Sequence, residues 1–279
     1  MNKVLKQFAI DDLKRMQAMS LEDKIERTKL LIKEYYEYFN GNVYVSFSGG
    51  KDSTVLLDIV RSLYPQIPAV YCNTGLEYPE INSFVNTVDN VTIIKPKRNF
   101  RQIILEKGYP VVSKDVAKKV YEARNTKSPA LLKLRMEGIK PDGRHSRQSA
   151  LPKKWHYLLD APFKIHSICC DIMKKYPFEK YERETGKHAI LGLLAEESSL
   201  RLISWVKYGC NAFEASHIQS RPLMFWTEQD ILEYIYKRSL PIASVYGTIV
   251  KGGGILFNRC RENRLYVLYV WYTFRTTSK

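Results

Sequence analysis

The stretch from Val43 to Val60 constrains the fold of this chain more than any other part. Residues 43–47 suit a β-strand, a turn follows at Gly49 and Gly50, and an apolar helix begins near residue 52. The order of strand, glycine turn and helix is typical of a βα unit in an α/β protein. Unpaired amides and the positive end of the helix dipole at such a helix start bind anions. The segment therefore predicts an anion-binding turn.

The side chains around this turn add further anion-binding groups. Lys51 supplies a mobile cation, and Asp52 and Ser53 are able to cap the helix or to hold a metal ion or a hydroxyl. A Walker A loop has Ser or Thr directly after its lysine, whereas this chain has Asp52. The alternative interpretation is an ordinary βα turn before a capped helix. The candidate phosphate-contacting residues of the turn are Ser46, Ser48, Gly49, Gly50, Lys51, Asp52 and Ser53.

Composition sets broad limits on the class of protein. The 279 residues, 45% of them apolar, suit one sizeable α/β domain with an appendage, or two small domains. No run of 18 apolar residues is present, and acidic residues interrupt the N-terminus, so we expect neither a membrane span nor a signal peptide. Five unevenly spaced cysteines favour a reducing cytoplasm over a disulfide framework. The net charge of +15 indicates a polyanionic partner, namely a nucleotide, DNA or RNA, or else merely a soluble surface.

The pattern along the chain alternates strands with helices. Residues 3–39 are expected to form one or two amphipathic helices. Further helices are expected at 52–63, 79–88, 99–107, 113–124, 129–137, 170–184 and 227–238. Strands are expected at 43–47, 69–72, 91–95 and 189–194, and several of them are wholly apolar. Buried strands that alternate with helices predict an α/β fold with a doubly wound, mostly parallel sheet.

This pattern also predicts the organisation of the chain. We expect an N-terminal helical segment over 1–39, a nucleotide-binding α/β domain over 40–250 with a small helical C-terminal part, and an atypical tail over 251–279. In doubly wound folds the ligand sits beyond the carboxyl ends of the strands. Residues that follow the predicted strands are therefore the candidates for the site.

Two such segments carry polar groups. Asn73 and Thr74 suit hydrogen bonds to a purine or ribose, although they would also make a turn before a helix that starts with proline. After the strand at 189–194, Arg201 suits bidentate binding of phosphate or sulfate, although an N-capped helix with an exposed arginine fits equally well. The candidate nucleotide-binding residues of the two segments are Asn73, Thr74, Gly75, Glu77, Gly192, Glu197 and Ser198.

Adjacent cysteines stand at Cys169 and Cys170. Such pairs serve as metal or cluster ligands, or they are simply buried small apolar residues. An iron–sulfur cluster needs two further thiolates, and Cys210 and Cys260 are lone candidates.

Several segments together resemble the adenine-nucleotide α-hydrolase group and, more narrowly, the phosphoadenosine phosphosulfate (PAPS) reductase family. Ser48–Ser53 matches the PP-loop of that family, and Asn73–Glu80 matches its second nucleotide motif. Gly192–Arg201 is similar to its Gly-x-Arg-x-x-Glu-Ser-x-x-Arg segment, with Leu194 at the usual arginine. Arg221–Ile235 looks like its downstream Pro-Leu and Trp-Thr helix.

The resemblance implies an enzyme that binds an adenine nucleotide, namely PAPS, adenosine phosphosulfate (APS) or ATP. It implies catalytic roles for Lys51, Asp52 and Arg201 in reducing an adenylyl sulfate to sulfite, with a thioredoxin-like protein as the reductant. Preorganised electrostatic stabilisation would be the main catalytic term. Further cations for the anionic end of the substrate would be Arg144, Arg147 and Lys174.

Two features of the sequence depart from that family and keep alternatives open. Cys169 and Cys170 are similar to half of the [4Fe–4S] motif of the APS-reducing branch, but the chain contains neither the later C-x-x-C pair nor the Glu-Cys-Gly-Leu-His segment. One alternative is an ATP- and Mg²⁺-using sulfur-transfer enzyme acting on DNA or tRNA, which the basic charge and the loop Lys140–Arg147 favour. The other is a nucleotide-binding product without turnover.

The tail suggests a frameshift. Leu265–Thr277 is rich in aromatic residues and reads as an exposed edge strand. If these residues are read one base later with permitted codons, a C-x-x-C pair emerges. We therefore predict a frameshift near residues 251–258, with an iron–sulfur cluster in an intact relative. A genuine C-terminal hairpin is the alternative, and the gene sequence decides between the two.

Overall fold

The computed structural model describes residues 3–214, 218–252 and 255–259. These residues fall into two compact units. The first runs to Ile94 and resumes at Phe178, and the second covers Lys95–Pro177. The domain boundaries predicted at residues 39 and 250 remain predictions. The predicted C-x-x-C reading of Leu265–Thr277 lies outside the described residues.

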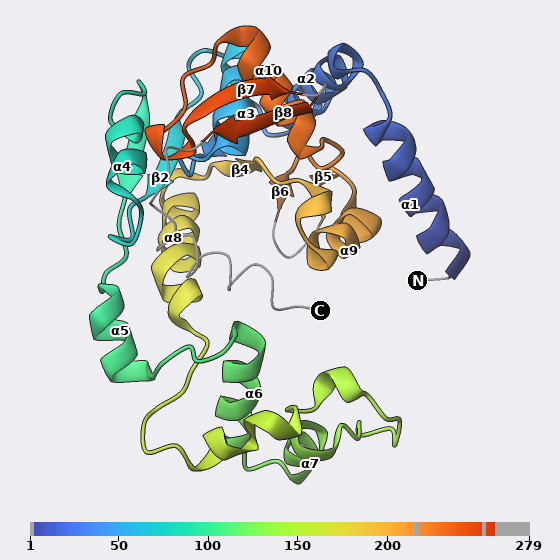
Figure 1. Ribbon diagram of the computed structural model, residues 1–279, viewed down its shortest axis with the longest axis vertical. Helices are drawn as coiled ribbons and strands as arrows, with labels where there is room; N and C mark the ends of the chain where they lie inside the picture. Colours follow the sequence, from blue (N-terminus) through green and yellow to red (C-terminus); the bar gives the residue numbers. More distant parts are fainter. Residues whose placement is uncertain (1–2, 215–217, 253–254, 260–279) are drawn as a thin grey trace. The chain divides into compact units, whose positions relative to one another are not determined.

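A six-stranded sheet forms the first unit, in the order β3-β2-β1-β4-β6-β5 (Figure 1). Its neighbours pair in parallel except β5 and β6, so the predicted mostly parallel α/β sheet is confirmed. The strands are β1 (Val43–Ser46), β2 (Ala69–Cys72), β3 (Val91–Ile94), β4 (His188–Leu191), β5 (Asn211–Ala212) and β6 (Gln219–Ser220). Because the chain leaves β1 toward β2 and later returns on the other side as β4, the β1–β4 boundary is a topological switch point, where open α/β sheets bind ligands.

Helices cover both faces of this sheet (Figure 1). Side chains of β1 alternate between the faces: Val43 and Val45 join the main core, while Tyr44 packs toward Phe178 and Tyr181 of α8. This alternation follows the two-residue period of a strand. The helices that belong wholly or mainly to this unit are α1 (Lys3–Gln17), α2 (Leu21–Tyr38), α3 (Lys51–Leu63), α4 (Pro79–Val85), α8 (Tyr176–Thr185), α9 (Ser199–Tyr208) and α10 (Glu228–Arg238).

Local signals explain where these helices begin and end. Ser20 caps α2 by accepting a hydrogen bond from the backbone N of Asp23 at 3.1 Å. Asn40 and Gly41 then take positive φ values of 48° and 77°, which ends α2 before β1. Thr227 and Asp230 form a capping box at the start of α10.

The segment after α10 is not wholly helical. β7 (Thr248–Gly252) and β8 (Ile255–Arg259) pair as an antiparallel two-stranded sheet, and a short 3₁₀ turn (Ser244–Tyr246) precedes them. The small helical C-terminal part predicted from the sequence therefore corresponds to α10. None of the helices in the described part of the chain combines the length and the apolar character of a membrane span.

The second unit is helical. It contains α5 (Phe100–Lys107), α6 (Lys114–Asn125), α7 (Pro129–Glu137) and the 3₁₀ segments η1 (Arg147–Ser149) and η2 (Lys153–Asp160). Its core gathers Val116, Ala117, Val120, Leu151, Leu158 and Ile165. The helix predicted over 170–184 starts as a π-helical turn (Asp171–Lys175) that continues into α8.

A buried ion pair joins α2 to α10. Lys24 is only 2% exposed, and its Nζ donates to Oδ2 of Asp230 at 2.7 Å. The same oxygen accepts hydrogen bonds from the backbone N and the hydroxyl of Thr227 at 2.6 and 2.8 Å. A buried charge needs such partners, because desolvation of an unpaired ion is costly.

We predict that Lys24→Met destabilises the protein by about 3 kcal/mol, because it leaves the Asp230 carboxylate buried without its cation. Urea unfolding followed by circular dichroism measures this change. The matched control is Lys29→Met, which removes a partly exposed lysine paired with Glu26 at 2.7 Å and should cost less than about 1 kcal/mol. Equal losses in the two variants would contradict the role given to burial.

Candidate functional site

The turn between β1 and α3 is built around two glycines. Gly49 has φ of +70°, and a Cβ atom there would lie 2.8 Å from the side chain of Ile81 and 2.9 Å from that of Val85. Gly50 is the N-cap of α3, and no side chain caps that helix. The first turn of α3 therefore presents backbone amides that are not occupied by a capping side chain, as an anion site requires.

Ser48 and Ser53 brace this turn from within. The backbone N of Ser48 donates to Oγ of Ser53 at 3.2 Å, and the two hydroxyls lie 3.0 Å apart. Ser53 also donates to the carbonyl of Gly50 at 2.9 Å and is 5% exposed. In this structure the two serines fix the shape of the loop.

Gly192 packs directly against the start of α3. A Cβ atom at this position would lie 2.9 Å from the carbonyl oxygen of Asp52 and 3.1 Å from Cα of Ser53. Only glycine permits such an approach of two backbones without displacement. The strand predicted over 189–194 ends at Leu191 in the structure, directly before Gly192. Gly192 thus supports the turn that is predicted to bind an anion, from the end of β4.

Lys51 contacts residues that were not among the predicted site residues. Its Nζ donates to Oε1 of Glu228 at 3.0 Å and lies 5.7 Å from the ring centre of Tyr246. The backbone N of Glu228 in turn donates to Oε1 of Glu196 at 2.6 Å. The lysine side chain is 12% exposed, whereas that of Glu228 is 64% exposed. The carboxylate side of this ion pair is therefore open to solvent, which weakens the pair.

These contacting residues carried only a weak signal in the sequence. Glu228 and Tyr246 fall in or near the segment that resembles the downstream family helix, but no pattern ties either of them to Lys51. The contact spans 177 residues of sequence. Only the packing of α10 beside α3, which Tyr234 and Asp58 link by a hydrogen bond of 2.6 Å, brings it about.

The segment after β2 forms a compact turn. Glu77 accepts hydrogen bonds from the backbone N and the hydroxyl of Thr74, at 2.9 and 2.7 Å. Asn73 accepts from the backbone N of Gly75 at 3.0 Å, which is an Asx turn. Gly75 has φ of +77°, and no atom would lie within 4 Å of a Cβ placed there. The turn is thus internally satisfied, with open space beside Gly75.

The segment after β4 forms an N-capped helix. The hydroxyl of Ser198 accepts from the backbone N of Arg201 at 3.3 Å and caps α9. The guanidinium of Arg201 pairs with the Glu197 carboxylate, and both side chains are largely buried. This geometry matches the helix-cap interpretation, and the role of Arg201 as a sulfate or phosphate clamp remains a prediction.

The adjacent cysteines lie in the second unit. Cys169 is buried beside Ile103 and Met173, and Cys170 is partly buried. A hydrogen bond from Cys169 and the charges of Lys114 and Lys174 lower the pKa of Cys170 to about 6 against the opposing effect of burial. The pKa of Cys169 is raised, first by its hydrogen bond to Cys170 and then by burial.

The cysteine pair does not fit a four-thiolate cluster within the described residues. No group of three or more His, Cys, Asp or Glu side chains in that part of the chain is arranged to hold a metal ion. Cys72 and Cys210 belong to the first unit and are buried. Among the described residues, the structure thus places two adjacent thiols together without further cluster ligands, and the candidate Cys260 lies outside those residues.

The other predicted cations for the anionic end of the substrate also belong to the second unit. Nε of Arg144 donates to Oδ2 of Asp142 at 2.7 Å. Arg147 is exposed at η1, and Lys174 lies in the π-helical turn. Their part in the site remains a prediction.

Comparison with family models places most of the chain in a known domain family. The model described as phosphoadenosine phosphosulfate reductase domain matches residues 42–127 and 107–251. These two overlapping segments include the turn at 48–53, Gly192 and Glu228.

Two relatives illustrate the range of the sequence likeness. The chain is 27% identical over 208 residues to the adenosine 5'-phosphosulfate reductase of Geobacillus kaustophilus, which covers 74% of this chain and 68% of that protein. It is 29% identical over 118 residues to an uncharacterized protein of Methanocaldococcus jannaschii, which covers 39% of this chain. That second match spans only 28% of the length of the archaeal protein.

Two solved structures align with most of the chain at low similarity. The PAPS reductase of Candida auris, in a phosphate complex, is 15% identical with a TM-score of 0.41, covering 84% of this chain and 96% of that one. A U34-tRNA thiolase of Methanococcus maripaludis with its [4Fe-4S] cluster is 16% identical with a TM-score of 0.37, covering 89% of this chain and 71% of that one.

We predict that Gly192→Ala displaces the start of α3 and costs about 1–3 kcal/mol, because the added methyl group meets main-chain atoms. The affinity for adenine nucleotides should fall together with stability. Urea unfolding and calorimetric titration with AMP measure the two effects. Gly186→Ala is the control for nucleotide affinity: its φ of +66° makes alanine strained there, so stability should also fall, but a Cβ atom meets no neighbour within 4 Å and the affinity should be retained. An unchanged nucleotide affinity in Gly192→Ala would contradict the supporting role of Gly192.

We also predict that iodoacetamide alkylates Cys170 well before Cys169 at neutral pH. A thiol with a lowered pKa is mostly thiolate above that pKa, so the rate at Cys170 should rise with pH through a midpoint near 6. Peptide mass spectrometry after timed alkylation follows each cysteine. A midpoint above pH 8, or equal rates at both cysteines, would show that Cys169 and the neighbouring lysines do not stabilise the Cys170 thiolate.

Proposed function

Because the chain belongs to the phosphoadenosine phosphosulfate reductase family, we propose that it binds an adenine nucleotide at the PP-loop and reduces an adenylyl sulfate to sulfite. The observation that carries this proposal is the start of α3, which has no side-chain cap, lies at the sheet's switch point, and is supported by Gly192. The likeness to a protein named adenosine 5'-phosphosulfate reductase over 74% of the chain supports the choice of substrate.

The phosphate end of the nucleotide would lie against the first amides of α3. The aligned peptide dipoles favour negative charge at that point. Lys51 would exchange its carboxylate partner Glu228 for the phosphate, a small electrostatic change because the glutamate is largely exposed. The turn at Asn73–Glu77 would face the adenosine, and the open space beside Gly75 leaves room for it.

The reaction would proceed by thiol attack on sulfur. A thiolate of a thioredoxin-like dithiol forms a bond to the sulfur of the adenylyl sulfate, and the bond from sulfur to the phosphate oxygen breaks. The nucleotide monophosphate leaves with that electron pair. The second thiol of the reductant then attacks the sulfur atom of its first thiol, which now carries the sulfonate group. This step releases sulfite and leaves the reductant as a disulfide. Lys51 and the helix dipole would stabilise the charge that develops on the leaving phosphate.

Asp52 and Arg201 would have positioning roles in this scheme. The carbonyl of Asp52 fixes the start of α3 against Gly192. Arg201, held by Glu197, would orient the sulfate as a bidentate donor. A tightly paired arginine is preorganised, so little side-chain entropy is lost when it binds its anion.

A second candidate function is ATP-dependent sulfur transfer to a nucleic acid, with the PP-loop and Mg²⁺ holding pyrophosphate. The observation that favours it is the basic loop Lys140–Arg147. Hydrogen bonds fold this loop back on itself, including that from the backbone N of Lys140 to the carbonyl of Arg144 at 3.0 Å. Exposed arginines on such a loop suit contacts with phosphate groups.

Product analysis separates the two functions. The protein is incubated with APS or PAPS and a thioredoxin system, and in parallel with ATP, Mg²⁺ and tRNA or DNA. Sulfite release supports the proposed reduction, whereas pyrophosphate release that depends on nucleic acid supports sulfur transfer and overturns it. Tight nucleotide binding without either product identifies a binding module without turnover.

We predict that Lys51→Ala weakens the binding of APS or ATP about 10- to 100-fold, as expected for the loss of one charged hydrogen bond. Calorimetric titration measures the affinity. Lys207→Ala, which removes an exposed lysine of α9 in the same unit, should leave it unchanged. If Lys51→Ala binds as tightly as the unaltered protein, the PP-loop assignment is wrong.

A further inference from the structure

The positive charge of this protein is concentrated in its second unit. Residues 95–177 hold 20 lysines and arginines against 7 aspartates and glutamates, a net +13 of the +15 carried by the whole chain. Charge that merely keeps a protein soluble has no reason to gather in one unit. A strongly basic, compact unit is the electrostatic signature of a polyanionic partner.

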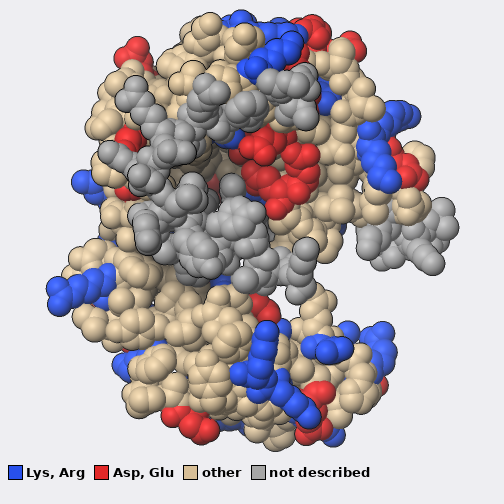
Figure 2. Space-filling view, in the orientation of Figure 1, with Lys and Arg blue, Asp and Glu red and all other residues tan. Residues whose placement is uncertain are grey.

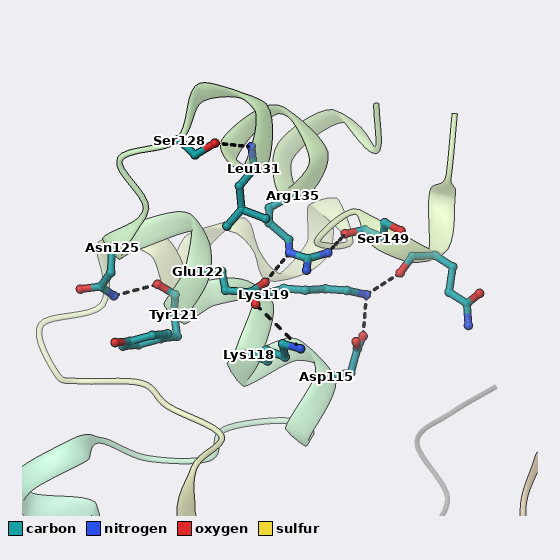
Figure 3. Close-up of polar contacts among 11 residues, drawn as sticks. Asp115, Lys118, Lys119, Tyr121, Glu122, Asn125, Ser128, Leu131, Arg135 and Ser149 are labelled. Atoms are coloured by element: carbon teal, nitrogen blue, oxygen red, sulfur yellow. Dashed lines mark hydrogen bonds and ion pairs between the residues drawn. The ribbon is translucent and has the colours of Figure 1, made fainter. Parts of the chain in front are cut away.

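In a polar network inside this unit, some of its acidic side chains pair with lysine and arginine (Figure 3). Lys119 is 6% exposed, and its Nζ binds Oδ2 of Asp115 at 2.5 Å and the carbonyl of Gln148 at 2.7 Å. Arg135 binds Oε2 of Glu122 at 2.5 Å and, through Nη1, the carbonyl of Ser149 at 2.8 Å. The acids of α6 are thus neutralised by inward-facing cations. The same bonds fasten η1 to α6 and α7.

The remaining cations of this region face solvent. On the face in view, lysine and arginine side chains stand out around α6 and α7 (Figure 2). The exposed bases of α6, of the α6–α7 linker, of α7 and of residues 147–160 are Lys118, Arg124, Lys127, Lys133, Arg147, Lys153 and Lys154. An exposed tyrosine, Tyr157, stands beside them at 64% exposure. Exposed cations interleaved with aromatic rings suit a nucleic-acid strand.

A hollow of about 410 Å³ lies among these cations. Its walls are Ala123, Leu132, Met136 and Leu159, and Arg124 completes its lining. Hydrogen bonds to the carbonyls of Phe163 and Ala161, at 2.9 and 3.1 Å, fix the guanidinium of Arg124. Apolar walls beside a fixed planar cation match an unpaired nucleobase, which stacks on guanidinium planes and aromatic rings.

We propose that α6, α7 and residues 147–160 form a binding surface for single-stranded nucleic acid. One base enters the hollow beside Arg124, and the backbone phosphates follow the lysines at Lys127, Lys133 and Lys153. A duplex fits less well, because its bases are stacked and paired and none is free to enter. This surface deepens the second candidate function by naming its partner, and it lies entirely within the second unit.

Fluorescence anisotropy with labelled single-stranded RNA, single-stranded DNA and duplex DNA over a salt series tests the proposal. The full chain should bind at least one of the single strands more tightly than the duplex. The triple variant Lys127→Ala, Lys133→Ala and Lys153→Ala should bind at least about tenfold more weakly. Its log affinity should fall less steeply with log salt by about 2, since each lost phosphate contact removes about 0.7.

Matched control variants distinguish the loss of this surface from the loss of the same positive charge elsewhere on the protein. The triple variant Lys33→Ala, Lys180→Ala and Lys207→Ala removes the same charge from exposed positions of the first unit and should retain binding. Leu132→Trp fills the hollow at a residue that is 42% exposed, and it should abolish the preference for single strands over duplex. Circular dichroism verifies that each variant is folded.

Several results would overturn the proposal. These are equal losses in the two triple variants, duplex binding as tight as that of both single strands, an unchanged strand preference in Leu132→Trp, or binding to anionic vesicles in place of oligonucleotides. Lys51→Ala, which tests the PP-loop, should keep its affinity for oligonucleotides. Failure of the nucleic-acid surface and failure of the nucleotide site are therefore told apart.

Discussion

The candidate site depends on one close approach between two stretches of backbone. The end of β4 passes so near the first turn of α3 that no Cβ atom fits between Gly192 and the carbonyl of Asp52. Within the turn itself, Gly49 leaves no space for a side chain against α4. These two glycines let the backbone around the helix start pack closely against its neighbours, and the amides of the first turn of α3 are the proposed binding surface. Backbone amides fixed in this way need no reorganisation when an anion arrives, which makes them effective electrostatic donors.

The ion pair between Lys51 and Glu228 is buried on the lysine side and exposed on the glutamate side. Lys51 is mostly buried, yet its carboxylate partner on Glu228 is mostly exposed. An arrangement of this kind keeps the lysine ordered beside the loop at little cost in free energy, because an exposed ion pair is weak. The hydrogen bond from the backbone of Glu228 to Glu196 connects this ion pair to the segment after β4. An ion pair and a hydrogen bond therefore connect the segments that follow β1, β6 and β4.

The sequence predicted the scaffold of this site better than the residues that contact Lys51. The order of strands and helices, the parallel sheet and the glycine turn all follow from local periodicity and turn chemistry. The short strands β5 and β6 were not predicted, because two-residue strands have no periodicity. Helix α9 was predicted only as the N-capped alternative for the segment after β4. Glu228 and Tyr246 could not be placed beside Lys51 either. Their proximity arises from the packing of α10, which the buried pair of Lys24 and Asp230 anchors to α2.

The measurement that tests the central claim most directly is a crystal structure of the protein with AMP or APS bound. The account predicts that the α-phosphate lies within hydrogen-bonding distance of backbone nitrogens in residues 49–53, with Lys51 turned from Glu228 toward the ligand. A nucleotide bound elsewhere, with this helix start unoccupied, would contradict the account.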